Sequence, residues 1–195
     1  MIRSTVPPGT SQNLNCFFMP EFLTEKNWKH DFQNCNSWIF GLTKNEHQNV
    51  TFISNVQKLI KYAFDNNKIK YNSVVFINSC EAEMIKYFRN TFLAVKVSFC
   101  NEIENFCKMK QIDYEKVKNI ATIDDRITRS HSNVPGPDGK HGYGGTCFPK
   151  DIHSLSYQMK EMGIVPYILH ASIERNEKLD RKDKDWKKNK GRSVL

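Results

Sequence analysis

The hydrophobic pattern predicts strands in the first part of the chain and helices in the second. Four short, largely apolar segments have the length of strands: residues 1–6, 14–19, 37–42 and 74–77. Residues 55–66 repeat apolar side chains at three- and four-residue spacing, which indicates an amphipathic helix between the last two strands. A strand, a helix and a strand in this order suggest an α/β layer.

The longest helix is expected to run from Ser79 to about Lys110. Ser79 can cap its first turn, where Glu81 and Glu83 also place negative charge. One apolar stripe follows it: Met84, Phe88, Phe92, Val95, Phe99, Ile103 and Phe106. Because further apolar residues lie off this stripe, we expect the helix to be covered on several sides.

Composition describes a polar-surfaced chain that can form one large domain or two small ones. Its 195 residues are 39% hydrophobic with a mean hydropathy of -0.60, and no apolar run is long enough to span a membrane. The six cysteines are scattered without a Cys-x-x-Cys pair, which favours free thiols in a reducing, cytoplasmic compartment. No signal peptide is expected, since the N-terminus leads directly into a Pro-Pro-Gly turn.

The net charge of +8 and the pI of about 9.1 fit a nucleic-acid partner, an anionic sugar nucleotide or mere solubility. Much of the excess lies in residues 181–192, and a terminal charge run is most often a solvated linker. No base-stacking pattern or recognition motif supports nucleic-acid binding. His141, Cys147 and His153 are too widely spaced for a zinc ligand pair, so no metal site is expected.

The segment His141–Asp151, with the sequence HGYGGTCFPKD, carries the most distinctive chemistry. Its glycines allow backbone conformations and close approaches that a Cβ would forbid. Pro149 and Asp151 predict a helix start, which places Cys147 at a helix N-terminus and favours an exposed thiolate. Lys150 adds positive charge to the same turn. The alternative is a structural glycine loop around a buried cysteine.

Ten consecutive positions of this segment resemble the catalytic-cysteine motif of the UDP-glucose/GDP-mannose dehydrogenase family, with Tyr143 where the family usually has phenylalanine. The resemblance implies that Cys147 attacks an aldehyde formed from the C6 alcohol of the sugar. It also implies NAD as cofactor, a sugar-nucleotide substrate and a homodimer formed through the long helix, and it assigns proton and water handling to Asp151. The substrate-binding residues that it implies are Glu25, Arg126, Gly144, Gly145 and Lys150.

Two segments near the N-terminus are similar to the same family. Ser4–Thr10 resembles a strand-end motif whose threonine, here Thr5, lies near the nicotinamide and the reacting sugar carbon. The Pro-Glu-Phe-Leu sequence that contains Glu21 resembles a loop that positions substrate and water and, like Thr5, contacts the cofactor. Glu25 would support the catalytic lysine. Without the resemblance these segments are a strand, a turn and two solvated glutamates.

The long helix carries a third similar pattern, Glu83-x-x-Lys86-x-x-x-Asn90. The resemblance implies that Lys86 stabilises oxyanion charge and that Asn90 binds the sugar. Without the resemblance, the apolar surroundings of Lys86 in the helix favour a side chain that extends its ammonium group to water. Arg126 resembles an arginine that reaches the sugar nucleotide of the neighbouring subunit, although taken alone it reads as a surface arginine.

The chain departs from the family in several places. The longer helix usual after the Pro-Pro-Gly turn is reduced to residues 11–13, and residues 26–28 and 34–36 differ from the family pattern. The glycine-rich cofactor motif and the third, nucleotide-gripping domain are not found. The chain therefore reads as a truncated central portion of such an enzyme.

The predicted fold is α/β. We expect the C-terminal part of a Rossmann-like domain at residues 1–79, an all-α central dimerisation domain on one long helix at 80–180, and a basic linker at 181–195. The implied function is the NAD-dependent oxidation of UDP-glucose to UDP-glucuronate through a cysteine thioester. The alternative is a catalytically incomplete fragment that serves as a dimerisation module. An incomplete sheet also predicts poor solubility, or a partner segment that pairs with its open edge.

Overall fold

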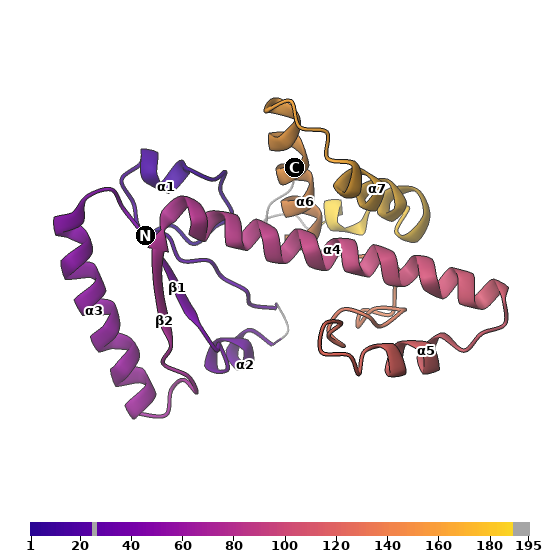
Figure 1. Ribbon diagram of the computed structural model, residues 1–195, viewed down its shortest axis with the longest axis horizontal. Coiled ribbons are helices and arrows are strands. Elements are labelled where there is room, and N and C mark those ends of the chain that lie inside the picture. Colours follow the sequence, from indigo (N-terminus) through magenta and orange to yellow (C-terminus); the bar gives the residue numbers. More distant parts are fainter. Residues whose placement is uncertain (25–26, 189–195) are drawn as a thin grey trace. The chain divides into compact units, whose positions relative to one another are not determined.

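The computed structural model describes residues 1–24 and 27–188 and forms two compact units, Met1–Phe88 and Arg89–Leu195. The longest helix, α4 (Ser79–Met109), contributes residues to both units (Figure 1). The boundary predicted between residues 79 and 80 lies at the start of α4, whereas the compact units divide within it.

The first unit is a small α/β layer. Its elements are α1 (Thr10–Asn13), α2 (Trp28–Gln33), β1 (Trp38–Leu42), α3 (Glu46–Asp65) and β2 (Val74–Asn78). β1 and β2 pair in parallel, with Trp38 opposite Val74 and Leu42 opposite Asn78. The predictions of strands at residues 37–42 and 74–77 are confirmed, and α3 supplies the crossover that a parallel pair requires.

Three other elements of this unit differ from their predictions. The strands expected at residues 1–6 and 14–19 are reduced to single bridges, in which Ile2 pairs in parallel with Phe18 and Phe18 pairs antiparallel with Gly41. The helix expected at residues 55–66 begins earlier, at Glu46, because the Asn45 side chain accepts a hydrogen bond from the Gln48 backbone and caps it there. The apolar spacing did not reveal these polar first turns.

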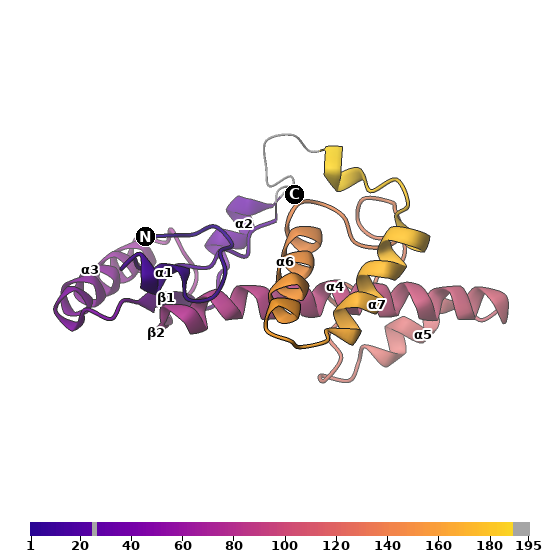
Figure 2. The same ribbon diagram turned by 90° about the horizontal axis from the view of Figure 1, so that it is seen from above.

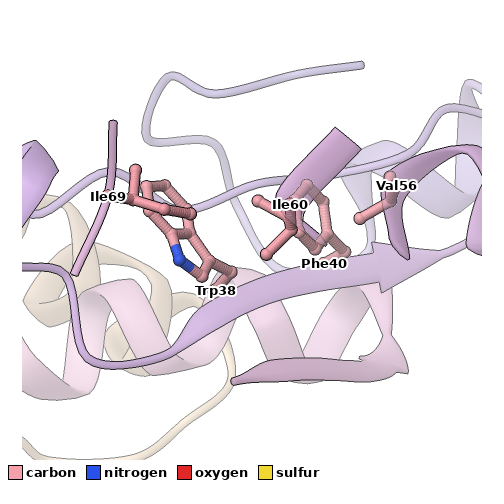
Figure 3. Close-up of a cluster of buried hydrophobic side chains, with 5 residues drawn as sticks. All are labelled: Trp38, Phe40, Val56, Ile60 and Ile69. Atoms are coloured by element: carbon pink, nitrogen blue, oxygen red, sulfur yellow. The ribbon is translucent and has the colours of Figure 1, made fainter. Parts of the chain in front are cut away.

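Successive side chains of β1 point to opposite faces of the sheet, so the first unit has one buried apolar cluster on each face. Figure 3 shows Trp38 and Phe40 packed with side chains of α3 and with Ile69. On the other face, Ile39 packs with Phe18 and with Ala82 of α4. A Cβ on Gly41 would lie 2.7 Å from the Ser79 Cα, so glycine allows the start of α4 to approach the sheet.

The helix α4 has the predicted bounds but not the predicted cap. Asn78, not Ser79, caps it, because the Asn78 Oδ1 accepts a hydrogen bond from the Cys80 backbone N–H at 2.8 Å. The Ser79 hydroxyl is buried and makes no hydrogen bond within the described part of the chain.

The predicted apolar stripe of α4 is exposed rather than covered. Its four phenylalanines are 58–65% exposed: Phe88, Phe92, Phe99 and Phe106. The residues that the structure describes therefore do not cover the helix on the side of these phenylalanines, although it was expected to be covered on several sides. Polar side chains occupy buried positions of the same helix instead, among them Glu83, Lys86, Asn90, Ser98 and Asn101.

The second unit is helical. It contains α5 (Tyr114–Ala121), α6 (Cys147–Glu161), α7 (Tyr167–Arg175), the π-helical turn η1 (Asn176–Asp180) and the 3-10 turn η2 (Asp185–Lys188). Figure 2 shows α6 crossing the direction of α4. Ala94, Tyr143 and Ile152 form the buried apolar cluster of this unit.

The basic C-terminal segment, as far as Lys188, is not simply solvated. Arg181 is only 3% exposed and forms ion pairs with Asp138 and Asp185. Lys184 pairs with Glu177 at 2.6 Å. Among the residues described, no helix is both long enough and apolar enough to cross a membrane.

Candidate functional site

Cys147 is the first residue of α6, with Thr146 as the capping residue. The helix thus begins two residues before Pro149, and the prediction that the cysteine lies at a helix N-terminus is confirmed. The thiol is exposed, which excludes the alternative of a buried structural cysteine. Backbone N–H groups at a helix start favour negative charge, so this position suits a thiolate nucleophile.

Asp151 lies on α6 one turn after Cys147 and is completely buried. Its Oδ2 accepts a hydrogen bond from the Asn90 Nδ2 at 2.5 Å, and its Oδ1 lies 2.5 Å from the Lys150 Nζ. A buried carboxylate requires such compensation, because desolvation without a partner is costly. The structure therefore brings together three of the predicted residues, Asn90, Lys150 and Asp151. The ammonium group of Lys150 forms an ion pair with the Asp151 carboxylate.

The two glycines predicted to bind substrate have different surroundings. Gly145 has φ +69, and a Cβ built on it would meet no atom within 4 Å. A Cβ on Gly144 would lie 1.6 Å from the Arg181 Nη1. Open space lies beside Gly145, whereas the guanidinium of Arg181 occupies the space beside Gly144.

In the first unit, the bridge between Ile2 and Phe18 places Thr5 and Glu21 at the same end of two parallel segments. The Ile2 N–H donates to the Phe17 carbonyl at 2.8 Å, and the Met19 N–H donates to the Ile2 carbonyl at 2.9 Å. Thr5 and Glu21 each follow the bridged residue by three positions. Ligands of α/β sheets commonly bind at such carboxyl ends of strands.

Arg3 connects Glu21 with Lys86 in the same unit. Its guanidinium Nη2 lies 3.5 Å from the Glu21 Oε2, and its carbonyl accepts a hydrogen bond from the Lys86 Nζ at 3.1 Å. Lys86 is only 6% exposed, so the alternative of a lysine that snorkels to water is wrong.

Glu83 has a role that the sequence analysis missed. Its buried carboxylate accepts hydrogen bonds from the backbone N–H of Gly9 at 2.6 Å and of Ser11 at 2.8 Å. These hydrogen bonds hold residues 9–11 and thereby the turn after the segment that contains Thr5. The only signal in the sequence was a glutamate three positions before Lys86, and nothing indicated its distant partners.

The central-domain profile of the UDP-glucose/GDP-mannose dehydrogenase family matches residues 80–178, just over half of the chain. The chain belongs to this family. It is 32% identical over 188 residues to a UDP-glucose 6-dehydrogenase of Rickettsia bellii, with 91% of this chain and 40% of that protein covered. It is also 32% identical over 190 residues to the UDP-glucose 6-dehydrogenase TuaD of Bacillus subtilis, covering 90% and 38% of the two.

A solved structure of a UDP-glucose dehydrogenase from Pyrobaculum islandicum matches the fold with a TM-score of 0.74 at 28% identity. The match covers 90% of this chain and 40% of that one. The chain thus spans about two fifths of the length of these family members.

Two residues assigned through the family resemblance lie outside these clusters. Arg126 is exposed and donates to the Asp124 carboxylate, which lowers the pKa of Asp124. Glu25 lies outside the described residues. Among the residues placed by the structure, no group of three or more histidine, cysteine, aspartate and glutamate side chains could hold a metal ion.

Proposed function

We propose that the chain carries part of the machinery of an NAD-dependent nucleotide-sugar 6-dehydrogenase that oxidises UDP-glucose to UDP-glucuronate through a cysteine thioester. The observation that carries the proposal is the pairing on α6 of an exposed thiol and a buried carboxylate. Cys147 supplies the nucleophile, and Asp151 one turn later is held by Asn90 and Lys150.

The cofactor would use residues of the first unit. Thr5 and Glu21 follow two bridged parallel segments at their carboxyl ends, where α/β sheets commonly bind nucleotides. Neither side chain is buried, so both can be reached by a ligand. NAD, when bound, supplies the acceptor for the two hydrides that leave C6 of the sugar.

The residues of the chain would provide the covalent part of the reaction. After C6 becomes an aldehyde, the Cys147 thiolate would add to it and form a C–S bond. The family resemblance assigns to Lys86 the role of offsetting the charge of the new oxyanion. Loss of the second hydride converts this adduct to a thioester. A water activated by Glu21 then adds to the carbonyl, and the C–S bond breaks to release the carboxylate and restore the thiolate.

Asp151 would serve the proton transfers of these steps. The amide of Asn90 fixes one oxygen of the carboxylate and Lys150 the other, so the group is oriented before the substrate arrives. Through the family resemblance, Asn90 would also bind the sugar.

The test is the replacement Cys147→Ser. The substitution is made in the complete enzyme, which is incubated with UDP-glucose and NAD, and UDP-glucuronate is quantified by mass spectrometry. We expect uronate formation by the unsubstituted enzyme and a loss of about a thousandfold or more in the variant, since a nucleophilic residue contributes on this scale. Unchanged uronate production by Cys147→Ser would refute the assignment of the nucleophile.

A second candidate function is a dimerisation module without catalysis of its own, and the exposed phenylalanines of α4 favour it. The two candidates differ in their affinity for NAD. Titration calorimetry with NAD discriminates them, because an affinity comparable with that of intact family members contradicts the non-catalytic function. Absence of binding together with a stable dimer supports it.

A further inference from the structure

The loop before Cys147 is held by two residues that follow α7 in the chain. Asn176 is buried in η1; its Oδ1 accepts a hydrogen bond from the Tyr143 N–H at 2.9 Å, and its Nδ2 donates to the Tyr143 carbonyl at 3.0 Å. One side chain thus satisfies both backbone groups of one loop residue. A Cβ on Gly142 would lie 2.2 Å from the Asn176 Oδ1, so the glycine allows this close approach.

Arg181 holds the same loop from a second direction. Its Nε donates to the His141 carbonyl at 3.2 Å, and its guanidinium also binds the carboxylates of Asp138 and Asp185. The group is buried and fixed by three partners, so it cannot easily swing aside for a Cβ on Gly144. Gly144 is therefore required by the arginine, whereas open space lies beside Gly145.

We propose that Asn176 and Arg181 are positioning residues for Cys147. They fix the backbone of residues 141–144, and this loop sets where α6 begins and where its first residue presents the thiol. The inference rests on the proposed role of Cys147 as the nucleophile. Small displacements of a reacting group are costly in catalysis, on the order of a hundredfold for about 1 Å.

A double-mutant cycle between Gly144→Ala and Arg181→Ala tests the proposal. The readout is the rate of alkylation of Cys147 by iodoacetamide, followed on its own peptide by mass spectrometry. We expect each single variant to lower this rate by about fivefold or more, because the thiol leaves its place at the helix N-terminus. In the Arg181→Ala background, Gly144→Ala should have no further effect, since its Cβ then meets no guanidinium.

Gly145→Ala is the matched control. It introduces the same methyl group one residue later, where nothing lies within 4 Å, although its φ of +69 adds strain. Its effect should be the same with and without Arg181. If Arg181→Ala does not fold, Arg181→Lys removes the forked head group and the cycle is repeated with it. An equal effect of Gly144→Ala in both backgrounds would overturn the proposal.

Two further readouts separate positioning from loss of folded protein. Alkylation of the buried Cys100 and Cys107 without denaturant reports unfolded protein and should stay negligible while the rate at Cys147 falls. Where the chain forms uronate, Asn176→Ala and Arg181→Ala should lower kcat with little change in KM for UDP-glucose. An unchanged alkylation rate in both variants refutes the positioning role. Uronate formation by Cys147→Ser, with the cycle intact, refutes only the proposed function.

Discussion

The two faces of α4 reverse the usual arrangement of a surface helix. Its large apolar side chains, such as Phe99 and Phe106, are exposed, whereas Glu83, Asn90 and Asn101 are buried. An ordinary amphipathic helix buries its apolar stripe and exposes its polar one. The comparison teaches that the polar face of this helix organises the chain itself, since a buried polar group is tolerated only with partners.

Three of the buried polar residues of α4 bind a loop or helix that carries a candidate site residue or lies next to one. Glu83 binds the turn after the Thr5 segment, Asn90 binds Asp151, and the Asn101 Oδ1 accepts from the Gly142 N–H at 3.1 Å. We expect the apolar face to bind a second copy of the chain, as the family resemblance implies.

The largest effect is expected from breaking the apolar face. Phe99→Ser combined with Phe106→Ser should weaken self-association by about a hundredfold to a thousandfold, because buried aromatic anchors contribute roughly 2 kcal/mol each. Sedimentation equilibrium measures the dissociation constant. The Tm of the dissociated chain should not fall, since both side chains are exposed within it.

The matched control is Leu59→Ser with Tyr62→Ser on α3, two side chains of similar exposure. It should leave self-association unchanged. A dimer of undiminished strength after the α4 substitutions would show that this face is not the interface.

The next effect concerns the polar face at Glu83. Glu83→Ala leaves the N–H groups of Gly9 and Ser11 without their acceptor, at a cost of about 2–4 kcal/mol. Thermal unfolding should show a Tm lower by about 5–12 °C for a chain of this size. Glu83→Gln retains one acceptor oxygen and should give an intermediate value.

Glu81→Ala is the control on the same turn. The exposed Glu81 accepts one hydrogen bond, from the Asn78 N–H at 3.1 Å, so its loss should lower the Tm by less than about 3 °C. If Glu81→Ala and Glu83→Ala lowered the Tm equally, the buried contacts of Glu83 would contribute no more to stability than an ordinary helix-capping contact.

A smaller effect is expected at Asn90. Asn90→Ala removes one of the two described partners of Asp151 and leaves Lys150 as the other. We expect the free energy of unfolding to fall by about 1–2 kcal/mol and the Tm by roughly 2–8 °C. Lys150→Ala removes the other partner and should have an effect of the same size. A Tm unchanged in both variants would mean that the buried carboxylate needs neither.

Local patterns predicted much of the fold. The apolar runs gave the correct positions of β1 and β2, the spacing of apolar residues located α4, and Pro149 with Asp151 indicated α6. The exposure of the phenylalanines of α4 was not predictable, because apolar periodicity states which residues share a face and not what covers that face. Lys86 and Glu83 show the same limit, since their partners Arg3 and Gly9 are far away in sequence.

The smallest effect concerns Arg181, which holds the same loop as Asn101 of α4 and is itself held by the carboxylate of Asp138. Burial is the largest single influence and would raise the pKa of Asp138, but the hydrogen bonds from Arg181 and from the Lys140 backbone, together with the charge of Arg181, lower the pKa below its usual value of 3.8. The ion pair therefore stabilises the fold above about pH 4 and is lost as the pH falls through the lowered pKa.

Asp138→Asn should accordingly lower the Tm near neutral pH by no more than about 2–4 °C, because the carboxylate is partly exposed and such pairs contribute under about 1 kcal/mol. The difference from the original chain should shrink below about pH 4 and vanish at lower pH. A pH-independent effect of Asp138→Asn would show that the charge of this carboxylate does not hold Arg181 against the loop.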